Sequence, residues 1–283
     1  MTETGSHVRV GDVEFFVVTV GDGPPLLVIH GGPGLGHSYL RSLDALAHER
    51  QVIYYDQRGA GRSATVDPAS LTFAGLLEDL EGLRAALGLE QVDLLGHSLG
   101  GHPAYLYAAR HPDRVRSLLL VDVGPPFDEE LGERMGAEFA SRRTREDDAA
   151  RRAIERSPSF RAREPEAVDA WVRNVYTPMF RDRATIGRLP FDLTAVGAPN
   201  VVGGEERIMG TLAELDPLGS LARIRCPTLV VHGALDPIPA AFSRLLAATI
   251  PGATFALIPG VSHFAFAEDP EPFFATVRAF LAR

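Results

Sequence analysis

Gly96-His97-Ser98-Leu99-Gly100 is the stretch that decides the fold, because the segments on either side give its Gly-x-Ser-x-Gly pattern a structural meaning. It follows the apolar run at 91–95, which is typical of a buried strand, and precedes residues 101–109, which favour a helix. A sharp turn between such a strand and helix holds the serine in a strained conformation with its Oγ exposed. We expect both flanking glycines to be required, because a Cβ there would clash with the neighbouring strand and helix.

The rest of the chain alternates strands with helices. Apolar runs predict further strands at 15–20, 26–30, 51–56, 115–123, 226–232 and 254–258, and helical patterns occur at 73–87, 240–249 and 270–282. This alternation indicates an α/β fold with a mostly parallel sheet and helices on both faces. Ligand sites in such sheets form at the carboxyl ends of the strands.

Residues 125–218 interrupt the alternation. The segment 128–176 is charged and helix-like, 197–204 is a loop rich in glycine and proline, and 205–215 favours a helix again. Because the whole block lies between two strands of the sheet, we predict a helical cap at 125–218 inserted into a core of residues 1–124 and 219–283. Such a cap would cover the strand ends and shape the pocket around Ser98.

Size and composition exclude several classes of protein. The 283 residues are 45% hydrophobic and 23% charged, which suits one large domain or a core with a lid. No apolar run approaches the roughly 18 residues that span a bilayer, and the first residues lack the features of a signal peptide. The single Cys226 cannot form an internal disulfide. We therefore expect a cytoplasmic protein without a membrane partner.

The charged residues of the chain exclude further classes of protein. A net charge of −9 argues against binding to nucleic acid or an anionic membrane. All 28 basic residues are arginine, which rules out a lysine nucleophile, a Schiff base and a phosphate-loop lysine. The Gly-x-Gly-x-x-Gly spacing of a dinucleotide site is absent as well. We expect no cofactor and no metal.

A serine nucleophile needs a base, and the base needs an orienting carboxylate. Asp236 follows a predicted buried strand, and His263 lies in the loop after the next strand. Both loops should therefore emerge at the same sheet edge as Ser98, in the chain order serine, acid, histidine. Asp122, at the end of another strand, is an alternative acid. Beside the nucleophile we expect His97 to be a packing or hydrogen-bonding neighbour.

The glycine-rich stretch His30-Gly31-Gly32-Pro33-Gly34 follows another predicted strand. Glycines allow a close approach and leave backbone N–H groups uncovered, as an oxyanion requires. We expect oxyanion donors from Gly32 or its neighbour Gly31, and from Leu99 after the nucleophile. A second loop, Asp56-Gln-Arg-Gly-Ala-Gly-Arg-Ser63, is assigned a structural role, with Arg58 or Arg62 bonding buried carbonyls.

With these motifs the chain resembles the α/β-hydrolase superfamily over essentially its whole length. The stretches 30–34 and 56–63 are similar to those of the proline iminopeptidase group of serine aminopeptidases. In that group the cap supplies glutamates that bind the ammonium group of the substrate. The resemblance implies this role for Glu205, with Glu206 as a second candidate. A further glutamate that the group often has after the triad aspartate is replaced here by Pro237.

The resulting hypothesis is a serine hydrolase that cleaves an N-terminal aminoacyl amide, with a peptide or small molecule carrying a free amino group as its substrate. The alternative is an esterase, lactonase or thioesterase with the same triad, and lyases and binding proteins share the fold as well. Arginines clustered between 142 and 163 predict a solvated, ion-paired helix surface, or else a docking patch for a carrier-bound substrate.

Overall fold

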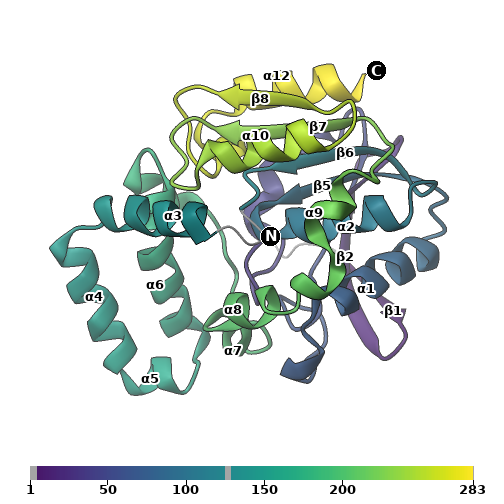
Figure 1. The fold of residues 1–283 in the computed structure, drawn as a ribbon. Helices are drawn as coiled ribbons and strands as arrows, with labels where there is room; N and C mark the ends of the chain where they lie inside the picture. The colour runs from purple at the N-terminus through teal and green to yellow at the C-terminus, as the bar shows by residue number, and fades with distance from the viewer. Residues whose placement is uncertain (1–4, 125–128, 283) are drawn as a thin grey trace.

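The computed structural model describes residues 5–124 and 129–282, which form an eight-stranded sheet flanked by helices (Figure 1). The strands are β1 (Ser6–Val10), β2 (Val13–Val20), β3 (Pro25–Ile29), β4 (Gln51–Tyr55), β5 (Val92–His97), β6 (Val115–Val121), β7 (Thr228–Gly233) and β8 (Thr254–Ile258). Their order in the sheet is β1-β2-β4-β3-β5-β6-β7-β8. Strand β2 pairs antiparallel with both of its neighbours, β1 and β4, and the strands β3 to β8 are all parallel to one another. The mostly parallel sheet predicted from the sequence is confirmed.

The register of the strands brings five loops to one edge of the sheet. Ile29 of β3 pairs with Gly96 of β5, and His97 pairs with Val121 of β6. In the same way β6 is in register with β7, and the last residue of β7 pairs with the last residue of β8. The loops that follow these strands therefore start side by side, because parallel strands present their carboxyl ends to the same edge.

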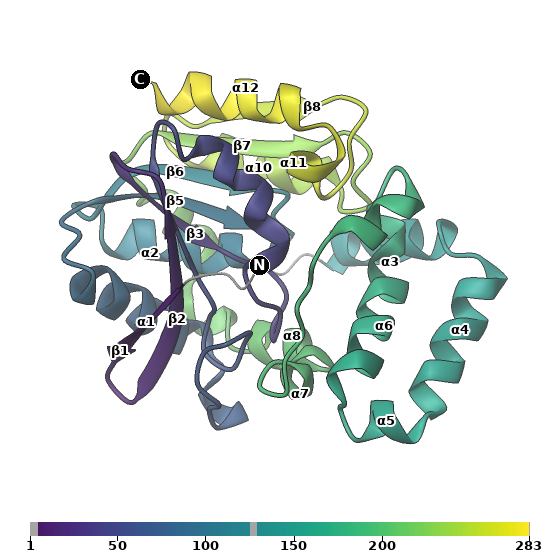
Figure 2. The ribbon, with the colours of Figure 1, turned by 180° about the vertical axis from the view of Figure 1, so that it is seen from behind.

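Helices cover both faces of the sheet (Figures 1 and 2). One apolar cluster joins one face to α1 (Phe73–Ala86), α2 (Gly101–Arg110), α9 (Pro217–Leu221) and α10 (Ala240–Thr249). A second joins the other face to the 3₁₀ helix η1 (Ser38–Leu46), α11 (Ala265–Glu268) and α12 (Pro270–Leu281). Strand β5 is buried along its whole length, because both of its faces are covered in this way.

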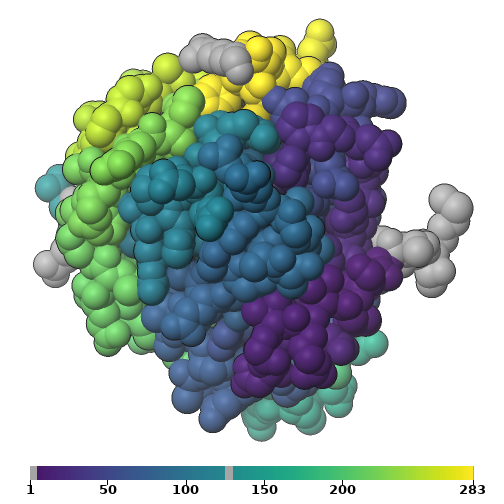
Figure 3. Space-filling model, turned by 90° about the vertical axis from the view of Figure 1, so that its right-hand side faces the viewer, coloured from purple at the N-terminus to yellow at the C-terminus, as the bar shows by residue number. Residues whose placement is uncertain are grey.

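Between β6 and β7 the described residues contain helices and no strand. Besides α9, they are α3 (Glu129–Ser141), α4 (Arg145–Arg156), α5 (Pro158–Arg161), α6 (Pro165–Tyr176), α7 (Ala198–Val201), α8 (Gly204–Met209) and the short 3₁₀ helices η4 (Thr177–Met179), η5 (Arg183–Arg188) and η6 (Ala213–Leu215). Helices α3 to α6 stand to one side of the sheet (Figures 1 and 2). Figure 3 shows the side of the molecule that faces away from α3 to α6. On this side the N-terminal strands and the segment around α1 and α2 form most of the surface.

One detail of this helical segment differs from the sequence prediction. The helix predicted over 205–215 is broken into α8 and η6, with Gly210 at the end of α8. The start of the predicted cap, 125–128, lies outside the described residues, and its end overlaps α9, which packs against α2 of the core. Across the part of the chain that the structure describes, no helix is long and apolar enough to cross a membrane.

The turn between β5 and α2 has no space for a side chain beside the serine. Ser98 has a φ of 54°, in the left-handed region that non-glycine residues rarely occupy. A Cβ on Gly96 would lie 2.5 Å from the carbonyl oxygen of Gly100. A Cβ on Gly100 would overlap the carbonyl oxygens of Ile29 and His30 in and after β3. Both glycines are thus required by close backbone approach, as the sequence analysis expected.

A Gly100→Ala substitution tests this packing. We expect it to lower the free energy of unfolding by about 3 kcal/mol or more, because the rigid backbone of β3 must move to admit the methyl group. The matched control is Gly136→Ala on α3, where a Cβ would meet nothing within 4 Å. That change should raise the free energy of unfolding by up to about 1 kcal/mol. Urea denaturation of both variants measures the difference, and equal stabilities would contradict the packing argument.

Candidate active site

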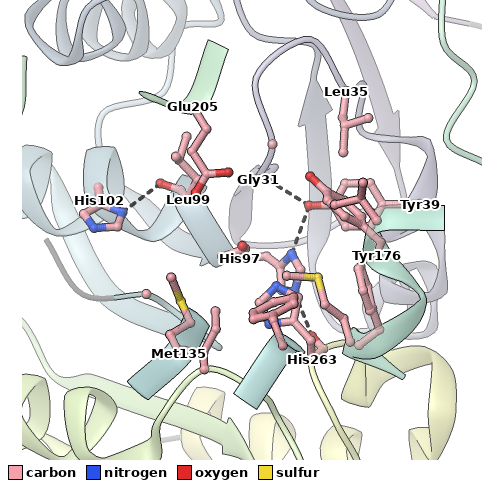
Figure 4. A pocket seen from close by; sticks show the side chains of 18 of the residues that line it. Gly31, Leu35, Tyr39, His97, Leu99, His102, Met135, Tyr176, Glu205 and His263 are labelled. Atoms are coloured by element: carbon pink, nitrogen blue, oxygen red, sulfur yellow. Dashed lines mark hydrogen bonds between the residues drawn. The ribbon is translucent and has the colours of Figure 1, made fainter. Parts of the chain in front are cut away.

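The loops at the carboxyl edge of the sheet and the helical segment above them enclose a cavity of about 380 Å³ (Figure 4). The core contributes Ser98 and Leu99, the β3 loop, and His263 from the loop after β8. The inserted segment contributes mainly apolar side chains, among them Met135, Phe139, Val175, Met179 and Met209. The result is an apolar pocket with a small number of polar groups, which is typical of a ligand site.

His263 lies in this wall with its imidazole held from behind. Its Nδ1 is 2.8 Å from Oδ2 of Asp236, and both side chains are buried. Because a carboxylate oxygen accepts, Nδ1 donates its proton to Asp236 and Nε2 is left as the basic nitrogen. Ser98, which is half-buried, lines the same cavity as His263. The three residues predicted as a triad are therefore brought to one place.

Asp236 is held in its charged form by its neighbours. Burial alone would raise the pKa of this carboxyl, but the adjacent His263 and a hydrogen bond from the Ile238 N–H keep its pKa below the usual value. The Ile238 nitrogen lies 2.9 Å from Oδ1. One carboxylate oxygen is thus bound to the backbone and the other to the imidazole, which fixes the direction of the carboxylate.

Asp122, the alternative acid, lies beside this pair and is not hydrogen-bonded to the histidine. Its Oδ1 accepts the Gly233 N–H at 2.8 Å, and its Oδ2 is buried without a hydrogen-bond partner among the described residues. Burial and the neighbouring Asp236 charge raise the pKa of Asp122 well above its usual value. Of the two candidate acids, Asp236 is the one that holds His263.

Asp122, Asp236 and His263 also offer three ligand atoms within 4.8 Å of one another. Asp236 and His263 are hydrogen-bonded to each other, and Asp122 accepts a backbone N–H. Each of the three side chains is therefore bound within the protein, and Oδ2 of Asp122 is left without a hydrogen-bond partner among the described residues.

The β3 loop passes directly against the serine. A Cβ on Gly31 would lie 2.8 Å from the Ser98 Cβ and 3.3 Å from the Leu99 nitrogen. The Gly31 N–H donates to the Tyr39 hydroxyl at 2.8 Å, so this amide is already occupied. Gly32 and Leu99 both line the cavity. Of the donors suggested by the sequence, these two remain for an oxyanion.

Glu205, on α8 of the helical segment, lines the cavity together with Ser98 and His263 (Figure 4). Burial raises the pKa of its carboxyl, and the nearby His263 partly opposes that rise. The residue still has substantial accessible surface, because it borders the cavity. The neighbouring Glu206 is exposed and does not line the cavity.

Several cavity residues were not predicted from the sequence. Among the aromatic residues of the helical segment, Tyr176 lines the cavity, whereas Trp171 bonds Glu155, and Phe180 and Phe191 are buried in the packing. His102 lies in the wall and its Nδ1 is 3.2 Å from the Leu99 carbonyl oxygen. The methionines carry no sequence signal for this place, because only the packing of the helical segment puts them there.

Several arginines of the 56–63 loop and of the 142–163 cluster bond other groups of the protein. Arg58 makes two 2.6 Å hydrogen bonds to Asp79, and it also donates to the carbonyl of Ser70. In the helical segment, Arg142 donates to the Leu235 carbonyl at 2.6 Å and Arg143 pairs with Asp148 at 2.8 Å. At least these arginines of the predicted cluster are engaged within the protein.

Comparison with known proteins agrees with this geometry. A family model described as alpha/beta hydrolase fold matches residues 24–270. The proline iminopeptidase of Lactobacillus helveticus is 30% identical over 276 residues, covering 91% of this chain and 90% of that protein. The crystal structure of VinJ superimposes with a TM-score of 0.76 at 21% identity, covering 99% of this chain and 98% of the other. A thermophilic esterase from Thermogutta terrifontis does so with a TM-score of 0.70 at 26% identity, over the same shares.

The resemblance to proline iminopeptidases that the motifs indicated is thus confirmed across nearly the whole chain. The fold, the order of the loops at the sheet edge and the family match agree with one another. The chain belongs to the α/β-hydrolase fold family.

Proposed function

We propose that this protein is a serine hydrolase that removes an N-terminal aminoacyl group from a peptide or a peptide-like small molecule. One observation carries the proposal: the Glu205 carboxyl borders the same cavity as Ser98 and His263. A carboxylate in an otherwise apolar pocket is the partner that a substrate ammonium group needs. The similarity to a proline iminopeptidase supports the same class of substrate.

The chemistry would proceed through an acyl-enzyme. Ser98 Oγ attacks the amide carbonyl carbon while its proton passes to His263 Nε2. The carbon–nitrogen bond then breaks, and His263 returns the proton to the leaving amine. A water molecule attacks the acyl group in turn, with His263 again taking and returning one proton. Asp236 holds the imidazole and stabilises its charged form through both steps.

The negative oxygen formed at each attack needs donors fixed in advance. We assign this role to the N–H groups of Gly32 and Leu99, since both residues line the cavity and the Gly31 amide is bound by Tyr39. The close packing of the β3 loop against Ser98 supports the assignment, because it leaves the loop little freedom to move.

The substrate ammonium would be bound by Glu205 of the helical segment. Burial raises the pKa of this carboxyl, which means that its charge lacks full compensation within the protein. An incoming ammonium group supplies that compensation and so favours the charged carboxylate. The apolar walls would receive the side chain of the N-terminal residue or the leaving group.

An ester hydrolase is the second candidate, and two observations favour it. Apart from Glu205 and the histidines, the cavity is lined mainly by apolar groups, and Pro237 occupies the place where the resemblance implies a second glutamate. An esterase is also among the structural neighbours. A panel of p-nitrophenyl esters, lactones and aminoacyl arylamides separates the two candidates by their kcat/KM values.

The two buried aspartates provide a test of the catalytic assignment. Asp236→Asn should lower kcat by about 10³- to 10⁴-fold, because the amide no longer holds the correct tautomer of His263. Asp122→Asn should change kcat by less than about threefold, since the amide oxygen can still accept the Gly233 N–H. Both are measured with p-nitrophenyl acetate, next to Ser98→Ala, which should be inactive. If Asp122→Asn is the more damaging change, Asp122 is the catalytic acid.

The proposed role of Glu205 predicts that the preference for a free amino group depends on pH, separately from the titration of the triad. We compare kcat/KM for an aminoacyl arylamide with that for its N-acetylated form, so that titration of the triad cancels in the ratio. Below the raised pKa of Glu205 its carboxyl is neutral, and above about pH 8 the substrate amine loses its proton. The ratio should therefore rise with pH, reach a maximum and fall again.

Glu205→Gln should lower this ratio about 10- to 100-fold at neutral pH and remove its rise on the acid side. Glu206→Gln is the matched control and should leave the ratio unchanged, because Glu206 does not line the cavity. Equal rates for the free and N-acetylated substrates with the unmodified protein would eliminate the aminopeptidase proposal and leave the ester hydrolase.

A further inference from the structure

Two buried side chains outside the triad connect the loops of the active site. Tyr39 belongs to η1, the 3₁₀ helix that follows the β3 loop, and His97 is the last residue of β5. The Tyr39 hydroxyl is 2.8 Å from the Gly31 nitrogen and 2.9 Å from Nδ1 of His97. Nε2 of His97 is 3.0 Å from the carbonyl oxygen of His263 (Figure 4). These contacts form one chain from the β3 loop to the histidine loop.

The direction of each hydrogen bond in this series follows from the groups at its two ends. The His263 carbonyl can only accept, so Nε2 of His97 carries a proton. In a neutral imidazole Nδ1 is then an acceptor, and the Tyr39 hydroxyl donates to it. The Tyr39 oxygen in turn accepts the Gly31 N–H. Every donor and acceptor along the chain is matched only when His97 is neutral.

The position of His97 agrees with this protonation state. Its ring centroid is 4.8 Å from that of His263, which must become positively charged during acyl transfer. A second positive charge at that distance would oppose the charging of His263. Burial and the neighbouring His263 lower the pKa of His97 to about 3. His97 therefore supplies hydrogen bonds without charge.

We propose that Tyr39 and His97 are positioning residues, which hold the oxyanion loop and the His263 loop in place on either side of Ser98. The proposal rests on the function proposed above. His97 binds the carbonyl of His263, while the N–H of His263 donates to the Met179 carbonyl at 3.2 Å. Both backbone groups of the catalytic base are thus held. Tyr39 occupies the Gly31 amide in the same way at the other loop.

The surrounding packing makes a clean substitution possible. The Tyr39 ring lies against Phe191, Phe264 and Phe266, with ring centroids 6.0, 5.9 and 6.5 Å away. Tyr39→Phe retains these aromatic contacts and removes only the hydroxyl. It leaves a buried N–H on Gly31 and a buried acceptor on His97 without their partner. A role in packing alone would survive this change.

Tyr39→Phe should lower kcat about 10- to 100-fold on p-nitrophenyl acetate, with KM changed less than about threefold, because the catalytic loops lose their fixed spacing. The matched control is Tyr105→Phe. Tyr105 is also buried, and its hydroxyl has no hydrogen-bond partner among the described residues. Removing this hydroxyl should leave kcat unchanged. Rates are normalised to the active sites counted from the initial burst, so a partly unfolded sample does not alter kcat.

A double-mutant cycle tests whether Tyr39 acts through His97. His97→Leu removes both the acceptor for the Tyr39 hydroxyl and the donor to the His263 carbonyl. Adding Tyr39→Phe to this variant should then reduce kcat less than threefold further. Losses that multiply, an effect on KM alone, or an unchanged kcat in Tyr39→Phe would each overturn the proposal.

The simple aryl ester separates this proposal from the proposed function. It needs no free amine, so its hydrolysis does not depend on Glu205. If Ser98→Ala still hydrolyses the ester, the serine hydrolase assignment fails. If Ser98→Ala is inactive while Tyr39→Phe retains full kcat, only the positioning role fails.

Discussion

The backbone of the β3 loop and the turn that carries Ser98 touch without intervening side chains. Gly31 faces the Ser98 Cβ, and Gly100 faces the main chain at the end of β3. Because main-chain atoms fill the space where side chains would lie, neither segment can shift without the other. The amide groups of the β3 loop are therefore set relative to the serine before any substrate arrives. Oxyanion binding depends on such preorganisation, since donors that must first reorient stabilise the transition state less.

The carboxyl groups of the site differ in how their charges are compensated. Burial disfavours the charged form of all three, Asp122, Asp236 and Glu205. Asp236 overcomes this effect because His263 and a backbone N–H face it. Asp122 has one backbone donor and a negative neighbour, so its pKa rises. For Glu205 only the nearby His263 opposes the effect of burial, so its pKa rises as well.

The sequence allowed the core of this site to be predicted and left most of the pocket wall open. The proximity of Asp236 and His263 could be predicted because each lies in the loop after a strand, and a parallel sheet brings the carboxyl ends of its strands to one edge. The choice between Asp236 and Asp122 required the structure, since both follow strands at that edge. Met135 and Phe139 could not be placed, because their position depends on how α3 packs over the sheet. The single helix expected over 205–215 is broken into α8, which ends with Gly210 as its C-cap, and the 3₁₀ helix η6. The apolar periodicity of the sequence did not show this break.

The helical segment and the core are joined at the catalytic loops themselves. The carbonyl of Met179 in η4 accepts the His263 N–H, and Arg142 at the end of α3 donates to the carbonyl of Leu235, next to Asp236. Beyond these bonds, Phe160 and Val168 share one apolar cluster with residues of the sheet. The segment that carries Glu205 therefore also supports the loops that carry His263 and Asp236. A change in the helical segment that reshapes the pocket will for this reason also disturb these two loops, because both depend on the same contacts.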